Sequence, residues 1–191
     1  MNKVRIIGGE LRSRVISFPD TDGLRPTPDR VRETLFNWLG QTLYGRSCLD
    51  LFSGSGALGF EAASRGAERV MMVEIDRTAL RALRDNVKKL GCTNVAVQGQ
   101  DGLEFVLRDA NRYDVIFLDP PFQKDYLPGL LEILPMRLNE NGVVYVESGT
   151  AIAVPPPWKT IKSGKAGQVY YQLLQIKETL NKSSRSYACA L

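Results

Sequence analysis

The residues best suited to chemistry are Asp119, Pro120, Pro121 and Phe122, which directly follow an apolar segment at 113–118. That segment has the composition of a buried strand, so the four residues lie just beyond a strand's C-terminal end. Proline fixes its own φ angle and holds the preceding residue extended, which fixes where Asp119 points. The Asp119 carboxylate and a backbone carbonyl can then accept both hydrogens of a planar amino group, and Phe122 offers a face for stacking. We therefore predict that these four residues catalyse a reaction on an exocyclic nucleobase amine.

A glycine-rich loop joins an expected strand at 47–51 to an expected helix at 57–65. The loop has the spacing G-x-G-x-x-G, and a strand before it with a helix after it is the context that a nucleotide-binding loop requires. The next expected strand, 69–73, is followed by Glu74, where an acid binds ribose hydroxyls in such folds. Because dinucleotide-binding dehydrogenases share this pattern, it leaves that class open. The loop glycines are Gly54, Gly56 and Gly59.

An acid ahead of the loop favours a different ligand. Asp50 lies at the ligand edge of the sheet, where a carboxylate suits a cationic amino-acid group better than a pyrophosphate. Residues 50–59 resemble the loop D/E-x-F-x-G-x-G-x-x-G of the S-adenosylmethionine-dependent methyltransferases, and this resemblance implies S-adenosylmethionine as the cofactor. It places Asp101 and Gly102 near the adenine ring, although Asp101 alone would also serve as a helix N-cap. The implied cofactor-binding residues are Asp50, Phe52, Gly54, Ser55, Gly56, Gly59, Glu74, Ile75, Asp101, Gly102 and Asp119.

The rest of the chain must bring these loops to one edge of a sheet. From residue 47 onward, strand-like and helix-like segments alternate, which predicts a parallel, doubly wound α/β sheet with right-handed crossovers. Two final strand-like segments, 158–163 and 168–176, are expected to close the sheet as an antiparallel pair, with Gly164 and Gly167 at the turn. Earlier in the chain, the remaining expected strands are 94–97, 113–118 and 142–147, and the remaining expected helices are 77–90, 101–109 and 126–138.

The N-terminal residues form an extension to this core. Residues 1–20 have the pattern of a short β-hairpin. Thr27 is expected to cap a helix over 28–43, with Pro28 at its first position. We expect a basic, RNA-binding extension at 1–26, a methyltransferase domain at 27–177 and a disordered tail at 178–191.

Composition narrows the function classes. The 191 residues include 43% apolar and 24% charged residues, as in ordinary globular proteins. The sequence has no apolar run of about 18 residues and no signal-peptide pattern, so we expect a cytoplasmic protein that does not enter a membrane. Three widely spaced cysteines and the absence of histidine argue against a zinc site, serine–histidine hydrolysis and cysteine–histidine proteolysis.

Charge is unevenly distributed along the chain. Residues 1–46 carry a net charge of +3 and residues 158–191 a net charge of +5, whereas residues 47–157 carry −4. A mildly acidic core with basic ends fits a catalytic domain with a nucleic-acid grip. A solvated surface with a basic tail is the alternative that charge alone leaves open.

Longer segments narrow the resemblance. Residues 5–14, the block 24–39 and residues 166–170 resemble the bacterial RsmD-type enzymes, over roughly 3–176 of the chain. This family implies a class I, Rossmann-like fold with a seven-stranded, mostly parallel sheet, helices on both faces and the N-terminal extension. It implies methylation of the N2 amine of guanine 966 of 16S rRNA in a small subunit or assembly intermediate, by a monomer that needs no metal. Ser13 departs from the family pattern, which often has glycine there. Candidate contacts to the RNA phosphates are Arg5, Arg12, Arg14, Arg25, Arg30 and Arg32.

Three other classes compete with this prediction. A DNA adenine or cytosine amino-methyltransferase shares the acid-Pro-Pro-aromatic segment, but the chain has no room for a separate target-recognition domain. A dehydrogenase would leave Asp119 and the two prolines unexplained. An inactive RNA-binding module for ribosome assembly would have no need of Asp50, Glu74 and Asp119 together.

Overall fold

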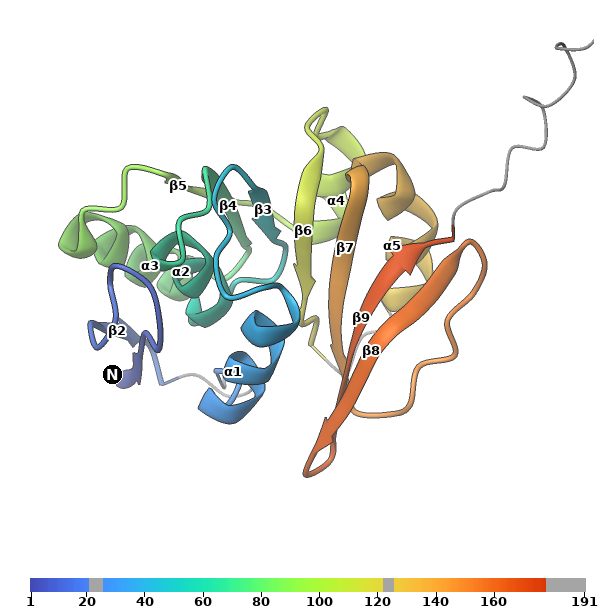
Figure 1. Ribbon diagram of the computed structural model, residues 1–191. Coiled ribbons are helices and arrows are strands. Elements are labelled where there is room, and N and C mark those ends of the chain that lie inside the picture. The colour runs from blue at the N-terminus through green and yellow to red at the C-terminus, as the bar shows by residue number, and fades with distance from the viewer. Residues whose placement is uncertain (21–25, 122–125, 178–191) are drawn as a thin grey trace, which may run out of the picture.

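A seven-stranded sheet forms the centre of the molecule (Figure 1). The computed structural model describes residues 1–20, 26–121 and 126–177. The strand order is β5-β4-β3-β6-β7-β9-β8, in which β9 is antiparallel to both of its neighbours and the pairs from β5 to β7 are parallel. The predicted sheet is therefore confirmed, including its antiparallel end. The strands are β3 (Ser47–Asp50), β4 (Arg69–Glu74), β5 (Val95–Gly99), β6 (Tyr113–Leu118), β7 (Leu138–Ser148), β8 (Trp158–Ala166) and β9 (Val169–Ile176).

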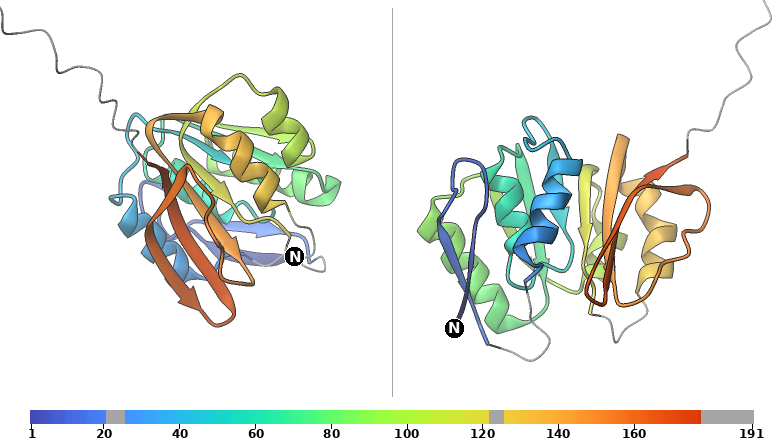
Figure 2. Two further views of the ribbon diagram at one scale, coloured as in Figure 1. Left: turned by 90° about the vertical axis from the view of Figure 1, so that its right-hand side faces the viewer. Right: turned by 60° about the horizontal axis from the view of Figure 1, so that its bottom comes forward.

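Helices cover both faces of this sheet and enclose two apolar clusters (Figure 2). One cluster holds buried side chains from α1, α2 and α3, and the other holds side chains from α4 and α5. The central strands are apolar on both faces because both faces are covered, as parallel sheets require. The helices are α1 (Asp29–Trp38), α2 (Ala57–Ser64), α3 (Arg77–Leu90), α4 (Gly102–Arg108) and α5 (Leu127–Ile133), and a 3₁₀ turn (Leu134–Arg137) follows α5.

The N-terminal hairpin packs into the same core as the sheet. Strands β1 (Asn2–Arg5) and β2 (Val15–Phe18) pair antiparallel, as predicted. Their inward side chains, Val4, Ile16 and Phe18, are buried in the cluster that also holds α1 to α3. The domain boundary at residue 26 stays a prediction, but the hairpin shares its apolar core with the main sheet.

The start and end of α1 correct two sequence expectations. The helix begins at Asp29 with Pro28 as its N-cap, and no side chain caps it. Thr27 was predicted as the cap, but its hydroxyl instead donates to Glu147 Oε1 at 2.7 Å. The helix ends at Trp38 rather than residue 43. Gly40 and Gln41 both have positive φ angles, which turn the chain away from the helical path.

Turn geometry corrects one expectation near the end of the chain and explains a family difference near its start. Gly164 lies inside β8, so only Gly167, with a φ of 60°, is at the turn. In the hairpin, Ser13 has a φ of 69°, a conformation that glycine adopts without strain. The backbone conformation therefore accounts for the glycine that the family resemblance implies at this position.

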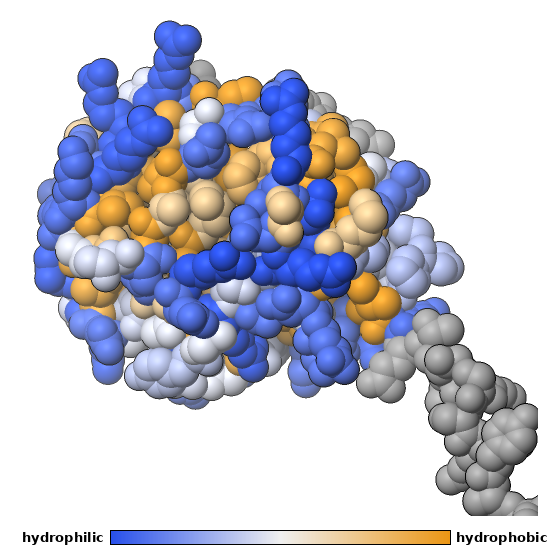
Figure 3. Space-filling model, turned by 90° about the horizontal axis from the view of Figure 1, so that it is seen from above, coloured by the Kyte–Doolittle hydropathy of each residue, from blue (hydrophilic) through white to orange (hydrophobic). Residues whose placement is uncertain are grey.

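The direction of the strand order changes between β3 and β6. From β3 the order runs outward to β4 and β5 on one side and to β6 and β7 on the other. In open α/β sheets, ligands bind at the C-terminal strand ends beside such a switch point. This edge lies at the bottom of Figure 1, beside α1. The opposite end of the sheet, seen in Figure 3, shows hydrophobic residues among projecting hydrophilic ones.

Candidate active site

The glycine loop packs too closely to accept larger side chains. Gly56 has a φ of 80°, and a Cβ there would lie 2.6 Å from the Leu83 side chain. A Cβ on Gly59 would lie 2.9 Å from Met72 and 3.0 Å from the Asp50 carboxylate. The predicted motif therefore has a packing reason at these two glycines, because α2 must approach the sheet closely for its first turn to face the ligand edge.

Asp50 ends β3 beneath this loop and is almost fully buried. Its Oδ2 accepts a hydrogen bond from the Gly59 N–H at 3.0 Å. Burial raises the pKa of Asp50 to about 7, and the nearby charges of Glu74 and Glu147 add to the effect. A buried carboxylate without a cationic partner in the described residues is suited to a positively charged ligand group.

Two acids follow at the ends of the neighbouring strands. Glu74, at the end of β4, accepts hydrogen bonds from the Gly54 N–H and the Asp76 N–H, each at 2.7 Å. Asp101 caps α4 by accepting from Leu103 N and Glu104 N, so the N-cap alternative is confirmed, and its adenine contact stays a prediction. The structure thus brings the predicted cofactor residues of three strands to one edge.

Apolar surface lies beside these acids. Ile75 is 66% exposed directly after Glu74, although large apolar side chains are usually buried. Across the edge, a Cβ on Gly102 would lie 2.9 Å from both the Leu51 carbonyl oxygen and the Phe52 ring. An exposed aliphatic side chain and a close backbone approach suit the binding of a flat ring.

Asp119 follows β6 on the other side of the switch point. Burial raises its pKa well above the usual range, and the charges of Glu147 and then Asp50 raise it further. Pro120 is buried and Pro121 is exposed, so the two prolines form the rim beside the carboxylate. Phe122, the predicted stacking platform, lies outside the described residues.

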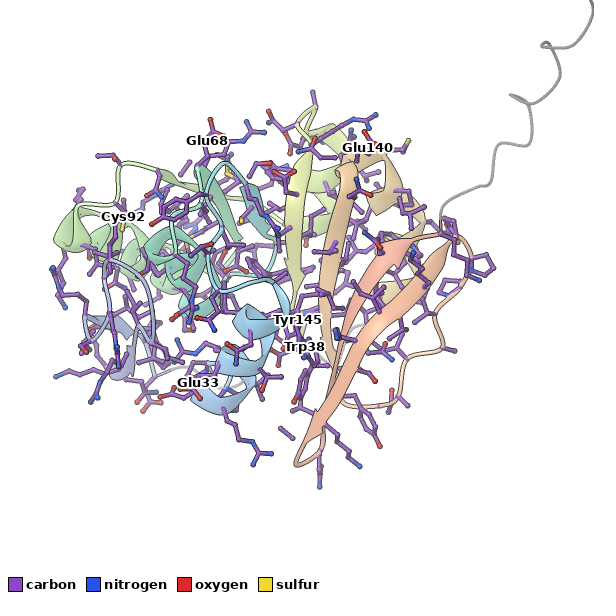
Figure 4. The ribbon with its side chains drawn as sticks, viewed as in Figure 1. Glu33, Trp38, Glu68, Cys92, Glu140 and Tyr145 are labelled. Carbon is purple, nitrogen blue, oxygen red and sulfur yellow. The ribbon has the colours of Figure 1, made fainter. Side chains whose placement is uncertain are left out.

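The sequence prediction missed Glu147 at the end of β7. This side chain is 3% exposed, and its Oε1 accepts from the Thr27 hydroxyl at 2.7 Å and from the Tyr145 hydroxyl at 2.9 Å. Burial raises its pKa, although both hydrogen bonds oppose the shift. The available signal was an acid at the end of a strand, the same pattern that identified Asp119. Figure 4 labels Tyr145 near Trp38, between α1 and the sheet.

The predicted RNA-binding arginines separate into different environments. Arg32 is fully buried, where it pairs with Asp29 at 2.6 Å and Glu61 at 3.4 Å, so the prediction that it contacts RNA is wrong. In the sequence, an arginine that pairs with buried acids in the core cannot be distinguished from an arginine on the surface. Arg25 lies outside the described residues. The exposed candidates are Arg5, Arg12, Arg14 and Arg30.

A separate cavity of about 680 Å³ lies between the hairpin turn, α1 and the end of α2. Its lining includes Arg12, Glu33, Asn37 and Arg65 but neither the glycine loop nor Asp119. We place the candidate active site at the strand ends because the buried carboxylates gather there. Within the described residues, no group of three or more potential ligands is arranged to hold a metal ion, and no helix is long and apolar enough to cross a membrane.

Comparison with known proteins identifies the family. The family described as Conserved hypothetical protein 95 matches residues 4–175. Ribosomal RNA small subunit methyltransferase D of Escherichia coli K12 is 41% identical over 182 residues, which cover 91% of this chain and 90% of that protein. The chain belongs to the RsmD family.

Further relatives agree with this assignment in sequence and in fold. The Haemophilus influenzae protein of the same name is 40% identical and covers 91% of this chain and 94% of its own length. The solved structure of Escherichia coli yhhF has a TM-score of 0.84 at 39% identity, over 92% of this chain and 99% of that one. That of the Thermus thermophilus hypothetical protein TTHA0928 has a TM-score of 0.77 at 28% identity, over 91% of this chain and 99% of that one. The predicted fold and family are confirmed.

Proposed function

We propose that this chain transfers a methyl group from S-adenosylmethionine to the N2 amine of a guanine in small-subunit ribosomal RNA. The observation that carries the proposal is the position of Asp119, Pro120 and Pro121 across the switch point from the acidic glycine loop. The small-subunit rRNA methyltransferases that are 40–41% identical support the substrate class. An rRNA substrate would place the reaction in the cytoplasm.

The residues at the strand ends fit S-adenosylmethionine. Buried Asp50 would hold its cationic amino-acid group, and Glu74 would accept from its ribose hydroxyls. Ile75 offers an exposed apolar surface for the adenine ring, and Asp101 and Gly102 would contact the edge of that ring. The cofactor supplies an electrophilic methyl group on a positively charged sulfur.

Asp119 would activate the acceptor amine. The lone pair of guanine N2 is delocalised into the ring, which makes the nitrogen a poor nucleophile. Hydrogen bonds from its two N–H groups to Asp119 and to the Pro120 carbonyl would favour a pyramidal nitrogen with a localised lone pair. The Asp119 carboxylate would also stabilise the positive charge that develops on nitrogen, and the proton released leaves to Asp119 or to water.

The RNA must deliver its base to this edge. A base inside a helix cannot reach Asp119, so the nucleotide has to leave its stack. Exposed Arg5, Arg12 and Arg14 on the hairpin and Arg30 on α1 would hold the surrounding phosphates. We propose that the protein acts as a monomer on the small subunit or on an assembly intermediate.

The test uses labelled S-adenosylmethionine and small subunits from a strain that lacks the corresponding methylation. The protein is expected to label 16S rRNA, and mapping of the labelled nucleotide is expected to give N2-methylguanine. Transfer to an adenine N6 would replace the proposed acceptor, and no transfer to small subunits, bare RNA or assembling particles would contradict the proposal.

A further inference from the structure

Two carboxylates lie at the ends of adjacent strands in this site. Strands β6 and β7 are parallel, and Leu118 pairs with Val146, which brings Asp119 opposite Glu147. Two residues earlier, the rings of Phe117 and Tyr145 contact each other with centroids 6.5 Å apart. Because side chains two apart point to the same face of a sheet, the two carboxylates face the same side.

Both carboxylates have acceptor capacity to spare. Hydroxyls of Thr27 and Tyr145 both donate to Oε1 of Glu147 and fix its orientation. Among the described residues, nothing donates to its Oε2 or to the carboxylate of Asp119, and every ion pair found there involves Asp29 or Glu61 instead. Among the described residues only Gln172 Oε1 is a fully buried side-chain polar atom without a partner, so the free oxygens of Asp119 and Glu147 remain accessible. The pair is therefore suited to a ligand that brings several N–H groups.

The edge of guanine meets that requirement and the edge of adenine does not. Guanine presents its N1–H next to its N2 amine, whereas adenine presents the lone pair of N1 next to its N6 amine. A carboxylate on the amine is therefore compatible with both bases. A second carboxylate beside it attracts the N1–H of guanine and repels the N1 lone pair of adenine.

We propose that Glu147 selects guanine by accepting its N1–H while Asp119 holds the adjacent amine. Asp119 is partly exposed and Glu147 is 3% exposed, so the base would enter past Asp119 with its N1 side innermost. Glu147 is then a specificity-determining residue, and Thr27 and Tyr145 position it. The proposal rests on the proposed function. It explains how guanine N2 would be chosen over adenine N6, a choice that Asp119 and its prolines leave open.

The test compares two bases at the methylated nucleotide in reconstituted small subunits. 2-Aminopurine keeps the 2-amine of guanine but has a lone pair in place of the N1–H. The wild-type protein is expected to prefer guanine in kcat/KM. In Glu147→Gln, the amide can donate to the N1 of 2-aminopurine, so the preference is expected to fall by about 10- to 100-fold, the worth of one charge-assisted hydrogen bond. Comparing the two preferences cancels the different reactivity of the two amines.

The fluorescence of 2-aminopurine gives a readout that does not depend on turnover. With S-adenosylhomocysteine present, the Glu147→Gln protein is expected to bind the 2-aminopurine subunit more tightly than the wild-type protein does. Glu140→Gln is the matched control, because Glu140 is an exposed acid on the same strand at the other end of the sheet, labelled at the top of Figure 4. It is expected to keep the wild-type preference and affinity.

The outcomes separate this proposal from the proposed function. If Glu147→Gln still binds S-adenosylmethionine in calorimetry and keeps the wild-type preference for guanine over 2-aminopurine, only the proposed role of Glu147 is overturned. If that variant does not fold, Glu147→Asp is used, which keeps the charge and is expected to lose rate while still preferring guanine; equal use of both bases would overturn the proposal. A wild-type protein that methylates no guanine overturns the proposed function itself.

Discussion

At the scale of single residues, the proposed mechanism is most demanding for Asp119, because its carboxylate has to be ionised where burial raises its pKa. We predict that Asp119→Ala lowers methyl transfer at least about 100-fold, as expected when a group that stabilises charge in the transition state is removed. Binding of S-adenosylmethionine is expected to change by less than about threefold, on the order of 0.6 kcal/mol. A tritium-transfer assay and calorimetry measure the two quantities.

Glu140→Ala serves as the control for this prediction, since it removes an exposed acid far from the site and is expected to leave both quantities unchanged. Full methyl transfer by Asp119→Ala would show that the carboxylate is dispensable.

Asp50 leads to a prediction about pH. Its pKa is raised to about 7, and only the ionised form attracts a cationic ligand. The affinity for S-adenosylmethionine is therefore expected to be highest above pH 7 and to fall as the pH drops below 7, by up to about tenfold per unit. Calorimetry from pH 5.5 to pH 8 measures this slope. Asp50→Asn is expected to bind more weakly and to lose most of the slope; a slope that persists in this variant would assign the effect to another group.

At the scale of elements, one buried acid on α2 connects the hairpin to the domain. Glu61 accepts from the Ile7 and Gly8 N–H groups at 2.9 and 2.8 Å, and it also pairs with Arg32 and Arg65. All four partners are donors, and both carboxylate oxygens are used. The hairpin is therefore held by hydrogen bonds that a neutral side chain cannot fully replace.

We predict that Glu61→Gln lowers the free energy of unfolding by about 3 kcal/mol, because it leaves buried charge on Arg32 without its full compensation. Urea denaturation followed by circular dichroism measures the change. The matched variant Glu33→Gln, on the exposed face of α1, is expected to change stability by less than about 0.5 kcal/mol. Equal stabilities for the two variants would mean that the hairpin docks mainly through its apolar side chains.

The order and type of these elements could be predicted from the sequence because their signals are local. Strand-like apolar segments, the glycine spacing and Gly91 after α3 each report on a few neighbouring residues. The errors come from contacts between distant parts of the chain. Thr27 looked like a helix cap, but Glu147, 120 residues away, takes its hydroxyl. Arg32 looked like a surface cation, and only the packing of α1 against α2 and the hairpin shows it as a core residue.

At the scale of the whole molecule, the exposed arginines of the hairpin are the cations that we propose for RNA binding. The hairpin carries three exposed arginines, Arg5, Arg12 and Arg14, and its turn lies beside the C-terminal ends of α2 and α3, where the Leu11 N–H donates to Ser64 and Arg14 donates to the Lys89 carbonyl. Both helices begin at the ligand edge and end beside this turn, so we expect its positive charge to attract RNA phosphates away from the nucleotide that is methylated.

Reversing two of these charges tests the arrangement. For Arg12→Glu combined with Arg14→Glu, we predict weaker RNA binding. The slope of the logarithm of the binding constant against the logarithm of the salt concentration is expected to become shallower by about one to two released counterions. Binding measured from 50 to 300 mM salt gives the slope. The control reverses Arg81 and Arg84 on α3 in the same way, two exposed arginines outside the hairpin. A slope that changes equally in both variants would mean that the hairpin is not the RNA-binding surface.

The antiparallel course of β9 has a practical consequence. Because β9 runs opposite to β7, it ends beside Val143, at the end of the sheet away from Asp119 and Glu147 (Figure 1). The N-terminus, by contrast, begins in the hairpin. A dye, affinity tag or surface linker attached after β9 would therefore start at the end of the sheet away from the candidate active site. One attached before β1 would stand where the RNA is expected to arrive, and single-molecule or pull-down experiments should use the C-terminal attachment.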